Sequence, residues 1–483
     1  MQADLTRITF DPEFDFTAVV QQQGRCEVDA DWNEEDRIHT WGMRRLAEDL
    51  IGPHGGPAGA HLGFAIGDTW PANMSPPHDH ECDEGNFVIG DGVYYVRGIR
   101  VWNREPVLYT RQPGHQMELE RCQTELTYLV YLEVWERHVT FLEEPQIREV
   151  ALLGPDTCTR LQLVWQVMVC PIHEQSSQGK AADKKATKKL PVKAKDQPYE
   201  TLPWGLAADL PAHPEKWSEV KRRAEQELHE CVHRVRPRLN ARVNGGEVPD
   251  DPCVQSPSAR YRGLENQLYR IEIHDAGDCP TFKWSRENGS VVFPIKGWNE
   301  IEPEQVVVDL ESLGRDERYG LQPNDIVEVV DDVVDLTHQS HPLLTVVRVD
   351  PSTRQVTLTG HLRVPLRKHK HPFLRRWDHR ARDHRKLHHG AIRYQEDVWI
   401  DIEDGIQICF EKRQAAPMTG DYWVIPARTA TGDIEWPPGR HHPTHFRPPR
   451  GIERAYAPLA YIKFDADSTT VIDVRRRFHH LAR

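Results

Sequence analysis

The sequence predicts an α+β protein, rich in β-strands, that is multi-domain, with small antiparallel sandwich or barrel modules and two prominent helices. The chain has 483 residues, and because a typical domain has roughly 150 residues, we expect about three domains. Most of the chain consists of short runs in which apolar and polar residues alternate, a period that is typical of β-strands. Only two longer stretches show the three- or four-residue spacing of an amphipathic helix.

The first helix is predicted from residue 32 to residue 51. Asp31 is placed to cap its first turn, and Glu34 to complete a capping box. Gly52 and Pro53 end it, because proline does not continue the helical hydrogen bonds and glycine permits the exit turn. The apolar residues that fall near one face are Ile38, Trp41, Leu46 and Leu50. We expect this face to dock on a sheet.

Several apolar runs around this helix and beyond it are predicted as strands, at residues 87–89, 93–101, 126–139 and 160–169. Gly90, Asp91 and Gly92 form the turn between the first two runs. Trp135 and Trp165 lie within the next two runs, and both are expected in or near a core because their side chains are large and apolar. Residues 1–173 therefore predict one helix docked on a sheet.

The composition changes abruptly after this region. Residues 174–195 contain seven lysines and no aromatic residue, so we expect a solvated linker or surface insertion. The second helix is predicted over residues 214–239, because its apolar residues form one continuous stripe. The residues of the stripe are Trp217, Val220, Ala224, Leu228, Cys231 and Val235.

The rest of the chain is predicted to be mostly strands, with Trp284 as a further core residue. The runs at 326–334, 343–350 and 355–359 predict an antiparallel meander in a small sandwich or barrel. Two strand pairs are expected after residue 396. The predicted segments are 1–173 (helix and sheet), 174–200 (linker), 201–256 (helical connector), 257–360 (sandwich or barrel), 361–395 (basic segment) and 396–483 (C-terminal β domain).

Residues 361–393 form a basic block in an acidic chain. The block has eleven Lys or Arg, two Asp and seven His, whereas the whole chain has a formal net charge of -13. The acidic remainder disfavours nucleic acid as the partner. We expect the block to dock on an acidic neighbour, or on an acidic part of the same molecule. The residues predicted to make an intermolecular contact are Phe373, Arg375, Arg376, Trp377 and Arg380.

Metal binding is the best chemical candidate. Cys170 and His173 form one pair of possible zinc ligands, and His229, Cys231 and His233 form another set on the second helix. His78, His80 and Cys82 form a third set. Each set is only half of a zinc site, so we expect no metal, and we expect the nine cysteines to be reduced thiols. The phosphate-binding patterns G-x-G-x-x-G and G-x-x-x-x-G-K-S/T are absent, and no cofactor is expected.

Four groups of longer segments carry a resemblance. They are QQQGRCEVDADWNEEDRIHTWGMRRLAEDLIGPHGG; VYLEVWERHVTFLEEPQIREVALLGPDTCTRLQLVWQV; PSARYRGLENQLYRIEIHDAG with TFKWSRENGSVVF; and TGDYWVIPARTATGDIEWP with GIERAYAPLAYI. Together they resemble an uncharacterised bacterial domain family whose members are frequently encoded beside contractile injection systems, the phage-tail-like particles with a sheath, tube, spike and baseplate. The resemblance spans nearly the whole chain and supplies no catalytic residues.

The resemblance implies a structural protein rather than an enzyme, at the baseplate or spike end of such a particle or as a fibre or cage element. Its partners would be baseplate, spike, tube or sheath proteins, and a homotrimer is the expected assembly. The chain start lacks a basic region followed by an apolar run, and no transmembrane span is expected, so we predict assembly in the cytoplasm. The alternatives are an effector enzyme carried by the particle and a glycan-binding surface protein.

Overall fold

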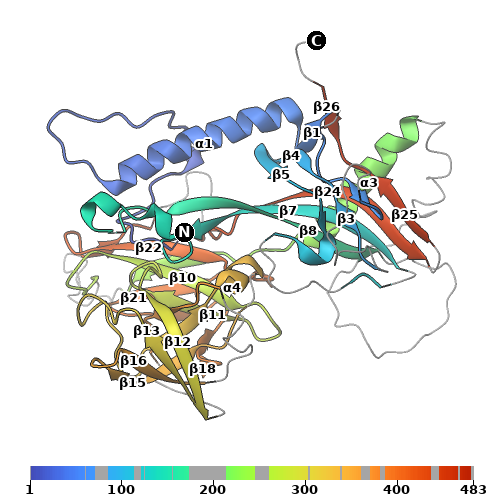
Figure 1. The fold of residues 1–483 in the computed structure, drawn as a ribbon. Coiled ribbons are helices and arrows are strands. Elements are labelled where there is room, and N and C mark those ends of the chain that lie inside the picture. Colours follow the sequence, from blue (N-terminus) through green and yellow to red (C-terminus); the bar gives the residue numbers. More distant parts are fainter. Residues whose placement is uncertain are drawn as a thin grey trace.

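The computed structural model describes residues 2–59, 61–70, 85–113, 121–123, 126–154, 156–172, 214–244, 260–302, 305–337, 340–360, 370–380, 387–436, 445–465 and 468–479. These residues form a β-rich protein with two long helices, several small sheets and a closed six-stranded barrel, which confirms the predicted fold class (Figure 1). The barrel lies at one end of the molecule, and the two helices lie on the other half.

A four-stranded antiparallel sheet is the centre of the half that carries the helices. Its order is β25-β24-β7-β8, with bounds Ser468–Asp473, Arg454–Asp465, Thr127–Val139 and Arg160–Ile172. Because side chains alternate along a strand, Val130 and Leu132 face one core, and Leu129 faces another. Both faces of this sheet are therefore covered.

Two small sheets cover the first of these faces. One has the order β26-β1-β4-β5, with bounds Arg477–Phe478, His54–Pro57, Gly92–Val96 and Ile99–Asn103. The other has the order β2-β3-β6, with bounds Ile66–Gly67, Val88–Ile89 and Val107–Leu108. The predicted strand 93–101 is in fact a hairpin, because Arg97 and Gly98 both have positive φ and form a tight turn between β4 and β5.

Helix α3 (Pro214–Val232) covers the other face of the central sheet. Its residues Val220, Ala224 and Leu228 are buried against β7, β24 and β25, as the stripe predicts. The helix ends before the predicted residue 239. Pro237 disfavours helical backbone at the residue before it, and the chain enters strand β9 at Leu239. Val235 is exposed outside the helix.

Helix α1 (Asp29–Ile51) runs along the surface above β7 (Figure 1). Its N-cap is Val28, which makes no side-chain capping bond, so the predicted cap at Asp31 is wrong and Asp31 lies inside the first turn. Gly52 ends the helix as predicted, with a positive φ and a hydrogen bond from its N–H to the carbonyl of Glu48. Of the residues predicted to face a core, only Ile38 is buried.

The closed barrel has the strand order β12-β13-β16-β15-β14-β17. The bounds are Val292–Glu302, Gln305–Leu310, Gln355–Thr359, Leu344–Asp350, Ile326–Val330 and Phe373–Trp377. The predicted meander of β14, β15 and β16 is confirmed. Helix α4 (Asp332–Thr337) follows β14, and an apolar cluster that includes Phe293, Val308 and Leu374 fills the interior.

A six-stranded sheet packs beside the barrel. Its order is β18-β19-β11-β10-β22-β23, with bounds Leu387–His388, Ala391–Arg393, Thr281–Ser285, Gln267–Asp275, Tyr422–Arg428 and Asp433–Ile434. A three-stranded sheet of β20 (Trp399–Asp401), β21 (Ile406–Phe410) and β9 (Leu239–Val243) shares its apolar core. Short 3-10 helices lie at Pro12–Phe14, Tyr109–Arg111, Pro145–Ile147 and Val150–Leu152.

The sheets combine strands from segments that the sequence analysis separates. The central sheet joins β7 and β8 to the C-terminal strands β24 and β25, and the barrel takes β17 from the basic segment. The described residues also locate the three tryptophans that were expected in or near a core. Trp135 and Trp284 are buried, and Trp165 is partly buried against the core of the central sheet, so this expectation is confirmed. The lysine-rich residues 174–195 lie outside the described residues.

Candidate functional site

Strands β10 and β11 carry a polar face that is buried. In β10 the residues Arg270, Glu272 and His274 alternate with apolar residues that belong to the core of the six-stranded sheet. Lys283 of β11 lies directly opposite Glu272 in the antiparallel register, so its side chain is on the same polar face. Such alternation usually indicates one face in water, yet every residue from Gln267 to His274 is buried.

The barrel covers this polar face. Strands β14 and β17 are paired so that Glu328 lies opposite Arg375, and both side chains are buried at the junction with β10 and β11. Lys283 donates from Nζ to both carboxylate oxygens of Glu328, at 2.8 and 2.7 Å. Trp377 donates from its indole nitrogen to Glu328 at 2.8 Å. Charged contacts thus join the barrel to the six-stranded sheet, and an apolar cluster of Ile326, Leu343, Trp377 and Ala391 lies at the same junction.

Glu272 is the second carboxylate of the junction. It accepts a hydrogen bond from Arg270 Nε at 2.6 Å, and its other oxygen lies 3.3 Å from Lys283 Nζ. Burial alone would raise the pKa of Glu272, but the charges of Arg270 and Lys283 outweigh it and hold the pKa at about 2. The pKa of Glu328 is lowered in the same way, against the effect of burial, mainly by Lys283. Both groups are therefore carboxylates at neutral pH.

A cavity of about 100 Å³ opens beside these charges, between the barrel, the six-stranded sheet and β7. Its polar walls come from residues that are far apart in the sequence: Gln2, Glu136, Arg137, His138, Arg270, Glu272, His274, Lys283, Glu328, Ser340, Arg375, Thr419 and Tyr422. Gln2, Ser340 and Thr419 are partly exposed, so this part of the wall lies toward solvent.

Two histidines of the cavity wall are held neutral. Burial lowers the pKa of His274 to about 3, and the charge of Lys283 adds to this effect. Burial also lowers the pKa of His138 well below its usual value, with the nearby guanidinium groups of Arg375 and Arg270 acting in the same direction. Both imidazoles are therefore uncharged at neutral pH.

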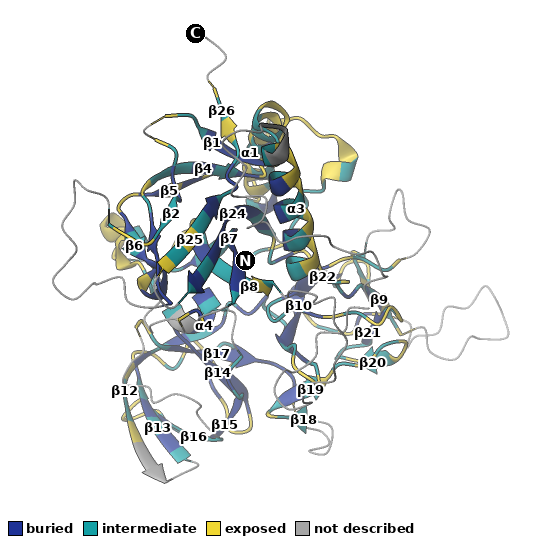
Figure 2. Ribbon diagram, turned by 90° about the vertical axis from the view of Figure 1, so that its right-hand side faces the viewer, coloured by how far each residue is buried: buried dark blue, intermediate teal, exposed yellow. Residues whose placement is uncertain are grey.

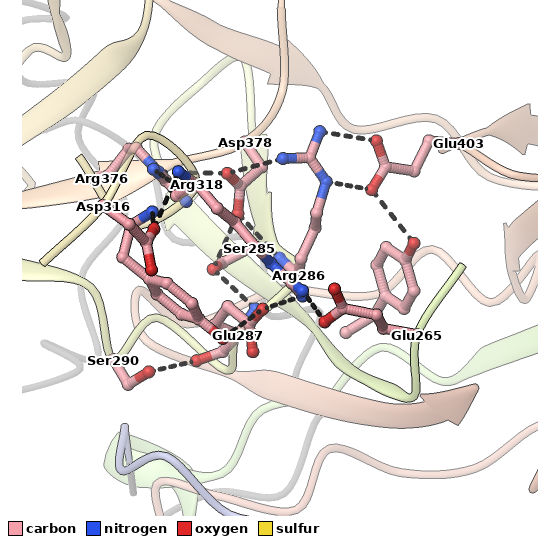
Figure 3. Close-up of polar contacts among 12 residues, drawn as sticks. Glu265, Ser285, Arg286, Glu287, Ser290, Asp316, Arg318, Arg376, Asp378 and Glu403 are labelled. Atoms are coloured by element: carbon pink, nitrogen blue, oxygen red, sulfur yellow. Dashed lines mark hydrogen bonds and ion pairs between the residues drawn. The ribbon is translucent and has the colours of Figure 1, made fainter. Parts of the chain in front are cut away.

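A second polar network lies next to the cavity, where β11 leaves the six-stranded sheet (Figure 3). Arg286 is clamped between two carboxylates, donating to Asp378 at 3.3 Å and to Glu403 at 2.8 Å. Asp378 also accepts bonds from the backbone N–H of Arg286 and from the hydroxyl of Ser285, at 2.8 and 3.1 Å. Every carboxylate oxygen of this clamp has a donor, so the network fixes the barrel against the sheet.

Glu287 is the one carboxyl group of this network whose pKa is raised to near neutrality. Burial is the main cause, and the negative charges of Asp4 and Asp378 add to it, so its pKa is about 7. Arg318 donates to it at 2.8 Å.

The structure corrects the predicted interface. Phe373, Arg375, Arg376 and Trp377 are all buried in strand β17, so they are not a surface for another molecule. Strand β17 pairs with β12 and β14 to close the barrel, and the acidic groups that it meets are Glu328 and Asp378 of the same chain. Arg380 alone is exposed, with 63% of its side chain accessible, and one of its Nη atoms lies 3.5 Å from Asp325 of the same chain. Residues 361–369 and 381–386 of the block lie outside the described residues.

The structure also corrects the predicted metal ligands. Cys170 of β8 and Cys231 of α3 form a disulfide, so this pair is not reduced and its sulfurs are not thiolate ligands. His173 and the set His78, His80 and Cys82 lie outside the described residues. Within the part of the chain that is described, no three His, Cys, Asp or Glu side chains are grouped so as to hold a metal ion.

No H-E-x-x-H helix is expected from the sequence patterns considered above, and this expectation is wrong, because the run His229-Glu230-Cys231-Val232-His233 has that spacing, which is typical of zinc-dependent hydrolases. The two imidazole rings stack at 4.5 Å between centroids at the end of α3. His229, Glu230 and His233 are all exposed, because Cys231 turns the opposite side of the helix toward β8. Among the described residues this gives two ligands on an open surface rather than a three-ligand cleft.

Helix α1 presents an apolar face to solvent. Trp32, Met43, Leu46 and Leu50 are 55, 71, 61 and 61% exposed. At about 100° per residue, their side chains fall within roughly 60° around the helix axis. We call these four residues the exposed face of α1; Figure 2 colours the described residues by how far each is buried.

The opposite side of α1 is attached by polar contacts. Arg44 donates to Glu136 of β7 at 2.5 Å, and Arg37 lies 3.5 Å from the same carboxylate. The backbone also approaches the β4–β5 hairpin closely, since a Cβ added at Gly98 would lie 1.9 Å from the carbonyl oxygen of Arg44. At the start of the helix, Thr6 donates from its backbone N–H to Asp29 at 3.0 Å. The helix is thus held in place with its apolar side outward.

One comparison with known proteins identifies a family. A family model described as a family of unknown function (DUF6519) matches residues 1–197 and 220–454, which is most of the chain. No curated protein and no solved structure matches the chain. Among the described residues, none of the helices is both long enough and apolar enough to span a membrane.

Proposed function

We propose that this chain, which belongs to the DUF6519 family of unknown function, is a structural protein of a contractile injection particle, at the baseplate or spike end or as a fibre or cage element. The setting comes from the resemblance described above. In this proposal the chain assembles in the cytoplasm, binds other particle proteins, and occurs in several copies, with a homotrimer as the expected form.

The exposed face of α1 is the observation that carries the proposal. Four large apolar side chains on one face of a surface helix are unusual in a protein that acts alone, and such a patch marks a contact with another molecule. The ion pairs to Glu136 hold the helix so that this face points away from the rest of the chain. Large apolar anchors of this kind supply most of the binding free energy of protein interfaces.

The spacing of the exposed face indicates what covers it. Residues 32, 43, 46 and 50 belong to a series with alternating steps of four and three, in which Asp36 and His39 are the polar members. That series is the seam of a helix that packs against another helix. The proposed occupant is therefore a helix of a neighbouring particle subunit.

The test is incorporation of a variant into assembled particles. Leu46→Ser with Leu50→Ser should leave the thermal unfolding of the isolated chain close to wild type, because both side chains are already in water, but should reduce its amount in purified particles at least tenfold. The matched control is Arg45→Ser with Asp49→Ser, two exposed residues one position earlier on the helix. This control should incorporate at wild-type level.

Equal incorporation of the two double variants would remove the exposed face of α1 from the particle contact. If the chain is never found with sheath, tube or baseplate proteins, the structural proposal itself is wrong. One specific observation would then favour a carried effector enzyme, namely the H-E-x-x-H run on α3. Its signature would be about one zinc per chain, lost in a His229→Gln variant, together with hydrolysis of a peptide substrate.

A further inference from the structure

We propose that the cavity between the barrel, the six-stranded sheet and β7 binds a small oxyanion, such as a carboxylate or phosphate group, with the guanidinium of Arg375 as its main contact. Arg270 and Lys283 supply the supporting positive charge. This site is separate from the exposed face of α1, so the proposal of an anion site does not depend on the proposed particle role.

The charges of the cavity wall do not balance. Three cations line its interior, Arg270, Lys283 and Arg375, but only two carboxylates face them, Glu272 and Glu328. The two remaining charged residues of the wall are turned to other partners. Glu136 pairs with arginines of α1, and the Nε of Arg137 donates to Gln162 at an exposed position. The cavity thus holds one positive charge in excess.

Both carboxylates of the cavity wall already accept hydrogen bonds from other donors. Glu328 accepts bonds from Lys283 and Trp377, and Glu272 accepts bonds from Arg270 and from the amide of Gln2 at 3.2 Å. The excess charge therefore remains on Arg375. Because these carboxylates have few free lone pairs, the same arrangement disfavours a metal cation as the occupant.

The guanidinium of Arg375 is buried. The residue is only 7% exposed, and its Nε atom is buried with no hydrogen-bond partner among the described residues. The guanidinium lies over the ring of Phe373, 5.2 Å from the ring centroid. Its guanidinium acts on Glu272 and Glu328 only through longer-range attraction. Burial of a guanidinium without a close anion is costly, and it is offset when a planar oxyanion accepts its forked N–H groups.

Two neutral imidazoles complete the site. The Nε2 atom of His138 and the Nδ1 atom of His274 are buried in the cavity wall, and neither has a hydrogen-bond partner among the described residues. A neutral imidazole donates one N–H, and its tautomer adjusts to the acceptor that is present. An oxyanion beside Arg375 would satisfy these buried donors together with the guanidinium.

The size of the cavity limits the ligand. A cavity of about 10–15 Å³ holds one water molecule, so the cavity of about 100 Å³ has room for several waters or one small anion. The partly exposed residues Ser340 and Thr419 lie in its wall, which gives a small ligand a way in. A polymer or a large polycarboxylate does not fit.

The experiment is thermal unfolding of the full chain at constant ionic strength, with chloride replaced stepwise by acetate, phosphate, sulfate or citrate. A ligand that binds only the folded state raises the midpoint temperature in a saturable way. We expect saturation with acetate, phosphate or sulfate and little response to citrate. Arg375→Met should abolish the response, and without added anion it should unfold at the wild-type temperature or above, because the variant buries no unpaired charge. Arg380→Gln, which removes an exposed charge three residues beyond β17, should respond like wild type.

Three results would overturn the proposal. One is the absence of any saturable response to all three small anions. Another is a response of Arg375→Met equal to that of wild type. If this variant does not fold, a crystal of the wild-type chain soaked in selenate decides the question. An anomalous peak within hydrogen-bonding distance of the Arg375 guanidinium supports the site. If the cavity shows no such peak, the proposal is overturned, and an acidic side chain of a partner protein becomes the expected contact of the guanidinium.

Discussion

The two long helices differ in which side they turn toward the protein. Helix α3 buries Val220, Ala224 and Leu228 on the central sheet, whereas α1 turns Met43, Leu46 and other large apolar residues to solvent. The two helices also differ in the role of their polar contacts with the rest of the chain. Those of α3 flank an apolar seam, with Tyr461 donating to Glu227 at 2.6 Å, but those of α1 are its main attachment.

An amphipathic pattern alone does not distinguish these two cases. Each apolar stripe predicts that one face of its helix is buried, but neither stripe shows which molecule covers that face. For α3 the cover is the same chain, so its stripe contributes to folding. For α1 we infer that the cover is a second molecule, so its stripe contributes to assembly instead.

The largest expected effect comes from truncation of the buried stripe. Leu228→Ala in α3 should destabilise the chain by about 2–5 kcal/mol, because it removes buried methyl groups and leaves a cavity against the sheet. Leu46→Ala in α1 should change the free energy of unfolding by about 0.5 kcal/mol or less, because the side chain is exposed in the isolated chain. Urea unfolding of both variants measures the contrast. An equal loss in the free energy of unfolding for the two variants would mean that α1 is covered within the chain, and would contradict the difference between the two helices.

The disulfide is the next difference, since it ties α3 to β8 and α1 has no such link in the described residues. Cys170 and Cys231 are 61 residues apart, so replacing both by serine should lower the free energy of unfolding by about 2–4 kcal/mol. The control is Cys26→Ser with Cys158→Ser, two exposed free cysteines, which should have little effect. A non-reduced tryptic digest should contain the linked Cys170 and Cys231 peptides in the wild type only. Wild-type stability of the Cys170 and Cys231 variant would show that apolar packing alone fixes α3.

The smallest expected effect is a pH dependence of the α3 attachment. Partial burial opposes ionisation of Glu225, but hydrogen bonds from His54 and Arg476 outweigh it and hold the pKa of Glu225 below its usual value of 4.5. Because this pKa is lowered in the folded state, its stabilising effect is present above pH 4.5 and is lost as the pH falls through the folded pKa. Glu225→Gln should therefore be less stable than wild type at pH 7, and the difference should shrink below pH 4.5. A difference that is constant between pH 7 and pH 3 would contradict this assignment.

Local pattern was sufficient for much of the fold. A run of apolar residues predicts β7, and alternation of apolar and polar residues predicts the β14–β15–β16 meander, because a strand repeats its side-chain direction every second residue whatever lies around it. The same locality explains the errors at the edges. The pattern does not show that Arg97 and Gly98 reverse the chain between β4 and β5, nor that the helix after residue 214 ends at Val232.

The charged cavity illustrates what local pattern does not contain. Alternation in β10 predicts a strand with Arg270, Glu272 and His274 on one face, and the usual expectation places that face in water. Only the pairing of β17 with β14 brings Arg375 and Glu328 over it and buries all of these charges. The basic block did contain a signal, because the sequence predicts that it meets acidic groups. The sequence does not show that Glu328 and Asp378 of the same chain are those groups.

The sequence by itself determined the class of this protein, the positions of most strands and helices, and the presence of a basic block and two amphipathic stripes. Each of these follows from spacing along the chain and needs no knowledge of distant neighbours. The tertiary structure alone decided that Cys170 reaches Cys231, that β17 is buried, and that α1 keeps its apolar face in water. These outcomes depend on which remote segments come together, and that choice is set by the packing of the whole chain rather than by any one segment.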